Sequence, residues 1–261
     1  MECRSVSLIL FFIGMSVFTL HHTAHAMTAQ EILDKGFREN LGESFRVALE
    51  LTSPQDKGKA VKHAFWFMGR RTKDKSSYFV DFDQPEESKG LRFLFVVPTG
   101  GKPEAYMYLP ASRKTLPLVM DDSSADLGGT GLTMEDLRAF IPEGDKDASI
   151  VKEEKIDGRD CYVIKIPNGE GKGYRLTWIT KDGLLGIKTQ HVGMNGKPTR
   201  EFRVVEFFET EQGKVFPREE EITIPDKRIK MRLRQEHAVF GIEIPDEVMD
   251  PKQFGTFRWK I

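Results

Sequence analysis

The chain has 261 residues, and its 39 Lys and Arg against 40 Asp and Glu leave a formal net charge of −1. This balance argues against a nucleic-acid partner and against electrostatic attachment to anionic lipid, because both need a basic surface. Phenylalanine is abundant, with 19 residues in a chain that is 30% charged. We therefore expect a soluble protein with a large aromatic interior.

The N-terminal 26 residues have the pattern of a targeting segment. Arg4 supplies a positive charge, residues 6–20 are almost wholly apolar, and Ala24-His25-Ala26 is a small-x-small cleavage site. The apolar run of about 15 residues is shorter than the ~20 that a spanning helix needs, so an uncleaved anchor is the weaker alternative. We predict a signal peptide cleaved after Ala26, then one monomeric periplasmic domain over residues 27–261 with no stable membrane anchor.

The two cysteines have different contexts. Cys3 precedes the apolar run and so cannot be the lipid acceptor of a lipoprotein, and cleavage would leave Cys161 as the single thiol. An intramolecular disulfide is then impossible, although the compartment would allow one. Residues 160–166 have the pattern of a strand, where a lone cysteine is typically a small buried apolar side chain. We therefore expect no nucleophilic role for Cys161.

After the targeting segment, the first predicted element is an amphipathic helix over residues 28–41. Thr28 and Glu31 have the spacing of a capping box, and Gly42 can end the helix. Alternating apolar and polar residues then predict a series of half-buried strands. These strands cover residues 45–51, 60–70, 75–82, 90–97 and 105–109.

The middle of the chain is predicted to form a movable lid. Residues 120–131 are acidic and rich in glycine, which is typical of a mobile loop. Thr133 is placed to cap a short helix over residues 134–140, with Asp136 at the third helical position. The residues assigned to the lid are Gly128, Gly129, Gly131, Met134, Leu137 and Phe140.

The C-terminal half is predicted to consist of strands joined by turns that have recognisable sequence signals. Asp157-Gly158, Asp182-Gly183 and Asn195-Gly196 are hairpin signals, and residues 242–261 form an irregular closing segment. We expect ten or eleven strands and two helices in a mainly β fold. The strands would form one antiparallel meander, apolar inside and charged outside, curved into an unclosed barrel lidded by the short helices. A β-sandwich is the alternative that the pattern leaves open.

Motifs for catalysis are scarce. His63, His191 and His237 are isolated in sequence, and the spacings typical of zinc sites and of a Gly-x-Ser-x-Gly elbow are missing. The acidic run at 219–221 is typical of a solvated strand edge. We therefore predict neither an enzyme nor a cofactor or metal site.

The positive signal is the excess of large apolar side chains in strands. Two short helices are too little to fill the concave face of so long a sheet, which predicts a hydrophobic cavity. An ordinary packed core is the alternative for any single residue. The candidates for lining the cavity are Phe65, Trp66, Phe67, Phe93, Phe95, Tyr106, Tyr108, Trp178, Met231 and Leu233.

Several blocks of the sequence resemble the LolA-like family of outer-membrane lipoprotein-sorting proteins. The most specific is Tyr108-Leu-Pro-Ala111, followed by Arg113-Lys114 and the stretch 127–137; residues 85–94 and 244–254 are similar to the family's strand entry and closing segment. The resemblance covers nearly all of residues 27–261. The family's acidic residue is missing from the 129–132 stretch.

The resemblance implies an open barrel lidded by helices, and a periplasmic carrier that moves lipid or lipoprotein acyl chains toward the outer membrane. It also implies an inner-membrane exporter as partner. Two alternatives from other classes remain open. One is a lipid-sensing regulatory module, which would have the cavity but a signalling partner. The other is a structural module with a solid core.

Overall fold

The computed structural model describes residues 27–54, 60–119, 126–139, 147–168, 172–211, 213 and 215–258. The predicted signal peptide, the first part of the glycine-rich loop and Phe140 therefore lie outside the described residues, as do the side chains of 137–139. In the part of the chain that is described, no helix combines the length and the apolar character needed to cross a membrane.

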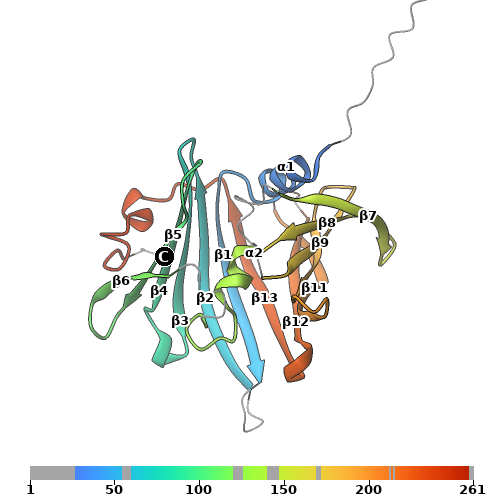
Figure 1. Ribbon diagram of the computed structural model, residues 1–261. Coiled ribbons are helices and arrows are strands. Elements are labelled where there is room, and N and C mark those ends of the chain that lie inside the picture. The colour runs from blue at the N-terminus through green and yellow to red at the C-terminus, as the bar shows by residue number, and fades with distance from the viewer. Residues whose placement is uncertain are drawn as a thin grey trace, which may run out of the picture.

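The described strands form one antiparallel sheet in the order β6-β5-β4-β3-β2-β1-β13-β12-β11-β10-β9-β8-β7 (Figure 1). The expected open, curved antiparallel sheet is confirmed, and the sandwich alternative is excluded. The strands are β1 (Ser44–Pro54), β2 (Ala60–Arg71), β3 (Lys75–Gln84), β4 (Arg92–Pro98), β5 (Glu104–Leu109), β6 (Lys114–Leu118), β7 (Ser149–Ile156), β8 (Arg159–Pro167), β9 (Tyr174–Thr180), β10 (Gly186–Val192), β11 (Pro198–Glu209), β12 (Val215–Ile224) and β13 (Ile229–Phe240).

The connectivity corrects the expectation of one continuous meander with ten or eleven strands. The chain runs outward from β1 to the edge strand β6, crosses to the opposite edge at β7, and returns to β13. The first and last strands thus pair in the middle of the sheet, with Phe45 opposite Phe240 and Leu51 opposite Leu233. Local alternation identifies strands, but it carries no information on which distant strands become neighbours.

Helix α1 (Ala29–Leu41) confirms the predicted capping. The Thr28 hydroxyl accepts a hydrogen bond from the Glu31 amide at 3.2 Å, and the Glu31 carboxylate accepts one from the Thr28 amide at 2.7 Å. Gly42 ends the helix with a φ of 71°. The buried side chains of Ile32 and Leu33 pack on β8 and β9, and the helix lies at the upper rim of the sheet in Figure 1.

Residues 126–133 and helix α2 (Met134–Ala139) lie against the concave face, where Figure 1 shows α2 in front of the central strands. Leu127, Leu132 and Met134 are buried in the concave core together with inward side chains of the central strands. The short 3-10 turns are η1 (Glu86–Ser88), η2 (Pro225–Lys227) and η3 (Asp246–Met249). The mainly β fold with few helices is therefore confirmed.

The convex face of β2–β4 is apolar, which corrects the expectation of a charged outer face. The segment after β13 covers it, and the cluster contains Met68, Phe79, Leu94, Val96, Ile244, Val248, Met249 and Phe254. Two arginines anchor this segment. Arg70 donates to the Ile244 carbonyl at 2.7 Å, and Arg92 donates to the carbonyls of Phe254, Gly255 and Phe257.

Candidate functional site

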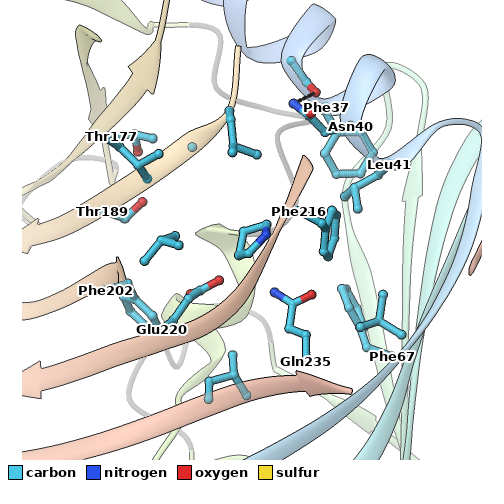
Figure 2. Close-up of a pocket in the computed structure, with 18 of the residues that line it drawn as sticks. Phe37, Asn40, Leu41, Phe67, Thr177, Thr189, Phe202, Phe216, Glu220 and Gln235 are labelled. Atoms are coloured by element: carbon cyan, nitrogen blue, oxygen red, sulfur yellow. Dashed lines mark hydrogen bonds between the residues drawn. The ribbon is translucent and has the colours of Figure 1, made fainter. Parts of the chain in front are cut away.

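The candidate site is an apolar cavity of about 270 Å³ on the concave face, between α1 and the inward side chains of β1–β3 and β9–β13 (Figure 2). It is partly open to solvent. Its aromatic and aliphatic wall includes Leu33, Phe37, Leu41, Phe45, Val47, Leu49, Phe65, Phe67, Val80, Leu132, Ile179, Phe202, Val204, Phe216 and Leu233. Such a surface favours ligands that have little polar area of their own.

The side-chain period of β2 decides which of its aromatic residues reach the cavity. Phe65 and Phe67 lie on the concave face and line the cavity. Trp66 lies between them in sequence and therefore points to the opposite face, because successive strand residues alternate. There it packs with the convex cluster, and the Arg46 guanidinium lies 4.9 Å from the centre of its ring.

The remaining predicted cavity residues lie in four different places. Leu233 lines the cavity, whereas Phe93, Phe95 and Met231 are buried in the concave core beside it and do not reach its wall. Tyr106 and Tyr108 pack with the convex cluster. In particular, Tyr108 of the family-specific block lies so close to Gly255 that a Cβ at Gly255 would overlap its ring.

Trp178 also lies away from the cavity. It belongs to a small cluster with Cys161 and Val163 on the face of β8–β10 opposite α1, and its indole donates to Glu154 at 3.0 Å. Cys161 is fully buried there, and burial raises the pKa of its thiol. A buried neutral thiol is a poor nucleophile, in line with the expected packing role.

Two polar residues of the cavity wall escaped sequence reasoning. Glu220 is 8% exposed and Gln235 is 7% exposed, and both side chains extend into the cavity between Phe202 and Phe67 (Figure 2). The run 219–221 suggested a solvated strand edge. Alternation along β12 instead turns Glu219 and Glu221 outward, where they pair with Arg232 and Lys230, and Glu220 inward.

Burial raises the pKa of Glu220 to about 7, because removal from water disfavours the carboxylate and nothing else shifts its titration. Another charged residue in the wall, Lys188, has its ammonium 3.0 Å from Glu201 and 4.8 Å from the Trp178 ring centre, on the opposite face. Besides Gln235, the residues Asn40, Thr177 and Thr189 supply uncharged polar groups of the wall. A carboxyl group that titrates near neutrality is thus built into an apolar cavity.

The folded state therefore holds the Glu220 proton more tightly than the unfolded state does. As the pH rises from about 4.5 to about 7, the unfolded chain loses this proton first, so stability falls across that window. At pH 8 we expect Glu220→Gln to raise the free energy of unfolding by roughly 3 kcal/mol, and at pH 5 by less than about 1 kcal/mol. Urea denaturation at both pH values measures this, and Glu221→Gln, on the outer face, is the matched control. An equal effect at both pH values would contradict the pKa assignment.

The close approach of α1 to the turn between β9 and β10 closes one end of the cavity. Gly36 permits it, since a Cβ there would lie 2.6 Å from the Leu184 carbonyl oxygen. The Asn40 amide donates to the carbonyls of Gly36 at 2.8 Å and Leu184 at 3.1 Å. The helix is therefore fixed to the hairpin by the Asn40 side-chain amide as well as by its apolar side chains.

The glycine-rich loop has more internal structure than its composition suggests. Gly128, Gly129 and Gly131 all have positive φ, and the Asp126 carboxylate accepts hydrogen bonds from the amides of Gly129 and Gly131. Thr133 caps α2 as expected: its hydroxyl accepts from the Asp136 amide at 3.4 Å, and the Asp136 carboxylate accepts from the Thr133 amide at 2.7 Å. The turn thus presents Leu132 to the cavity.

A cluster of polar side chains connects α2 to β10 and β11. Arg200 forms an ion pair with Asp136 and also donates to the Gly131 carbonyl at 3.0 Å. Desolvation raises the pKa of the Asp136 carboxyl, and the Arg200 guanidinium opposes that rise. The His191 Nδ1 lies 3.2 Å from the Glu135 carboxylate. We call Arg200, Asp136, His191 and Glu135 the α2 latch.

The same loop also lines a second, more polar cavity of about 550 Å³. Its wall includes His63, Asp126, Arg200 and Lys227. Burial lowers the pKa of His63, and Asp126 opposes this. Among the described residues, no group of three or more His, Cys, Asp or Glu side chains is placed to hold a metal ion.

A family model described as that of an uncharacterized protein matches residues 74–255, more than half of the chain. No curated protein matches the sequence. Three solved structures are similar. A candidate outer membrane lipoprotein-sorting protein domain from Vibrio parahaemolyticus has a TM-score of 0.76 at 17% identity, over 87% of this chain and 98% of that one.

The second structure is a DUF1329 family protein from Desulfovibrio piger, with a TM-score of 0.73 at 15% identity over 85% of this chain and 95% of that one. The third is a LolA superfamily protein from Nitrosomonas europaea, with a TM-score of 0.63 at 15% identity over 86% and 98% of the two chains. At such identities the likeness concerns the fold. The chain belongs to the family of uncharacterized proteins whose model it matches, and it has the fold of the LolA superfamily.

Proposed function

We propose that the protein is a periplasmic carrier that binds the apolar part of a lipid or of a lipoprotein acyl chain and moves it toward the outer membrane. The observation that carries the proposal is the partly open apolar cavity between α1 and the concave face of a LolA-like sheet. Each CH₂ group that a ligand buries there contributes about 0.8 kcal/mol. An acyl chain would therefore bind without any covalent step.

The size of the cavity limits the cargo. Its volume of about 270 Å³ lies just below the range of ~300–1,000 Å³ typical of small-molecule sites. One acyl chain or a compact apolar molecule suits that volume better than two or three chains. A larger cargo would require α2 and residues 126–133 to move away from the concave face.

The proposal includes the place and partners of this activity. The signal peptide predicted over residues 1–26 would deliver the chain, as a monomer, to the periplasm, where it would receive cargo from an inner-membrane exporter. The proposed role is binding without catalysis. The cavity favours a carrier or a lipid sensor over a structural module with a solid core. Carrier and sensor differ in their partner, so co-purification of an exporter rather than a regulator supports transport.

The cavity can be tested with diphenylhexatriene, a hydrocarbon dye that fluoresces when it leaves water. Val204 lines the cavity, whereas its neighbour Val205 is 53% exposed on the other face of β11. We expect Val204→Phe to fill the cavity and weaken dye binding at least about tenfold, and Val205→Phe to leave it unchanged. Circular dichroism verifies that both variants fold.

Two results would count against the carrier. One is equal binding by the two phenylalanine variants, which would place the dye elsewhere on the surface. The other is no dye binding by the wild type, which would favour a structural module. Native mass spectrometry of protein purified from the periplasm then identifies any lipid that co-purifies with it.

A further inference from the structure

The cavity wall carries the Glu220 carboxyl group and the Gln235 amide in a surface that is mostly apolar. Glu220 lies on β12 opposite Leu233 of β13, and Gln235 follows two residues along β13. The two residues are therefore diagonal neighbours on the same face of the sheet, a spacing that long side chains can bridge. Figure 2 shows both side chains reaching into the cavity from adjacent strands.

Neither side chain has a partner among the described residues. No hydrogen bond or ion pair within that part of the chain involves the Glu220 carboxyl or the Gln235 amide, although both residues are more than nine-tenths buried. The Asn40 amide, by contrast, is bound to backbone carbonyls. A buried polar group without a partner is unfavourable, so a partner supplied by a ligand would stabilise the complex.

We propose that Glu220 and Gln235 form a recognition point for a hydroxyl group on an otherwise apolar ligand, which enters the cavity with this hydroxyl inward. The proposal rests on the proposed carrier function and names its class of ligand. One hydroxyl suits the pair because it both donates and accepts: it donates to the Glu220 carboxyl and accepts from the Gln235 amide. The chain of the ligand then contacts Phe67, Phe202 and Phe216.

Other polar groups fit this pair less well. A hydrocarbon or an ether leaves the Glu220 carboxyl without a donor. A carboxylate would meet Glu220 as a like charge, and the Lys188 ammonium lies on the opposite face of the sheet, where it pairs with Glu201. An amine would bring a second charge out of water, and the desolvation of a buried ion pair can exceed the attraction within it. A neutral hydroxyl adds a hydrogen bond and no charge.

The test is competition against bound diphenylhexatriene by 1-decanol, its methyl ether and decylamine. In the wild type we expect decanol to compete at least about tenfold better than the ether, because the hydroxyl donates to the carboxyl. In Glu220→Leu this ratio should fall to about twofold or less, with an intermediate value in Gln235→Leu. Glu221→Leu, which faces outward, should keep the wild-type ratio, and dye binding itself should persist in all four proteins.

The outcomes separate the two proposals. Dye binding without a preference for decanol in the wild type overturns the hydroxyl site and leaves the carrier standing. A preference that survives in Glu220→Leu also overturns it. If decylamine competes more than tenfold better than decanol, the pair is a cation site and the hydroxyl assignment is wrong. If the wild type binds no dye, the carrier and the hydroxyl site both fail.

Discussion

Replacing Phe254 with alanine is expected to lower the free energy of unfolding by about 3–5 kcal/mol, the range for large aromatic truncations in a packed core. Phe254 is fully buried on the convex face, and its ring meets Phe79 edge-on with 6.3 Å between ring centres. It is held there because Arg92 donates to its carbonyl at 2.9 Å, while Arg92 also pairs with Asp81 at 3.1 Å. The truncation leaves a cavity that these backbone anchors prevent from collapsing.

Urea denaturation followed by circular dichroism measures the loss. The control is Met194→Ala, since Met194 is 71% exposed and its truncation should change stability by no more than about 0.5 kcal/mol. If Phe254→Ala and Met194→Ala were equally stable, the C-terminal segment would unfold independently of the sheet.

Helix α1 and strand β4 show what a local sequence pattern can and cannot predict. The pattern of residues 28–42 predicted the helix and both of its ends, because capping is decided by residues three apart. The apolar run of β4 predicted a strand, yet Leu94 and Val96 need a cover that lies some 150 residues further along the chain. The period of a strand states which residues share a face, and it does not state what packs against that face.

The candidate site shows the same limit at the level of single residues. Aromatic content alone selected Phe65, Trp66 and Phe67 together, although a strand must turn Trp66 away from its two neighbours. Strict alternation in the acidic run 219–221 would have turned Glu220 inward. Because carboxyl groups are rarely buried, an acidic run by itself nevertheless predicts a solvated strand edge. The pairing of β12 with β13, which brings Gln235 beside it, is a long-range feature.

Replacing Arg200 with alanine is expected to release α2 from the sheet. Asp136 has a side chain only 3% exposed, and without the guanidinium its carboxylate would be buried and uncompensated. Breaking such a pair costs about 3–5 kcal/mol while the element stays docked, so undocking of α2 becomes the less costly response. Hydrogen exchange should then rise at the amides of residues 126–136 and remain unchanged in β2 and β3. Dye should also enter the cavity faster, because Leu132 would leave its wall.

The effect should depend on pH. Desolvation raises the pKa of Asp136 and Arg200 opposes it, so the variant has a still higher folded-state pKa than the wild type. When folding raises the pKa of a carboxyl group, the folded state accommodates the protonated form better than the carboxylate. The folded protein therefore loses stability as the pH rises through the folded-state pKa. The destabilisation by Arg200→Ala should therefore be larger at pH 8 than at pH 5, and Arg200→Ala with Asp136→Asn should remove the difference.

Arg203 provides the matched control three residues along β11. Its ion pair with Asp157 is exposed, with 45% and 59% of the two side chains accessible, so Arg203→Ala should cost at most about 1 kcal/mol and leave exchange at α2 unchanged. If Arg200→Ala behaved like Arg203→Ala, the buried pair would not hold α2, and the apolar contacts of Leu127, Leu132 and Met134 would suffice. If Arg200→Ala loosened α2 without faster dye entry, the dye would reach the cavity by a route that does not involve α2, and residues 126–139 would be a fixed cover rather than a lid.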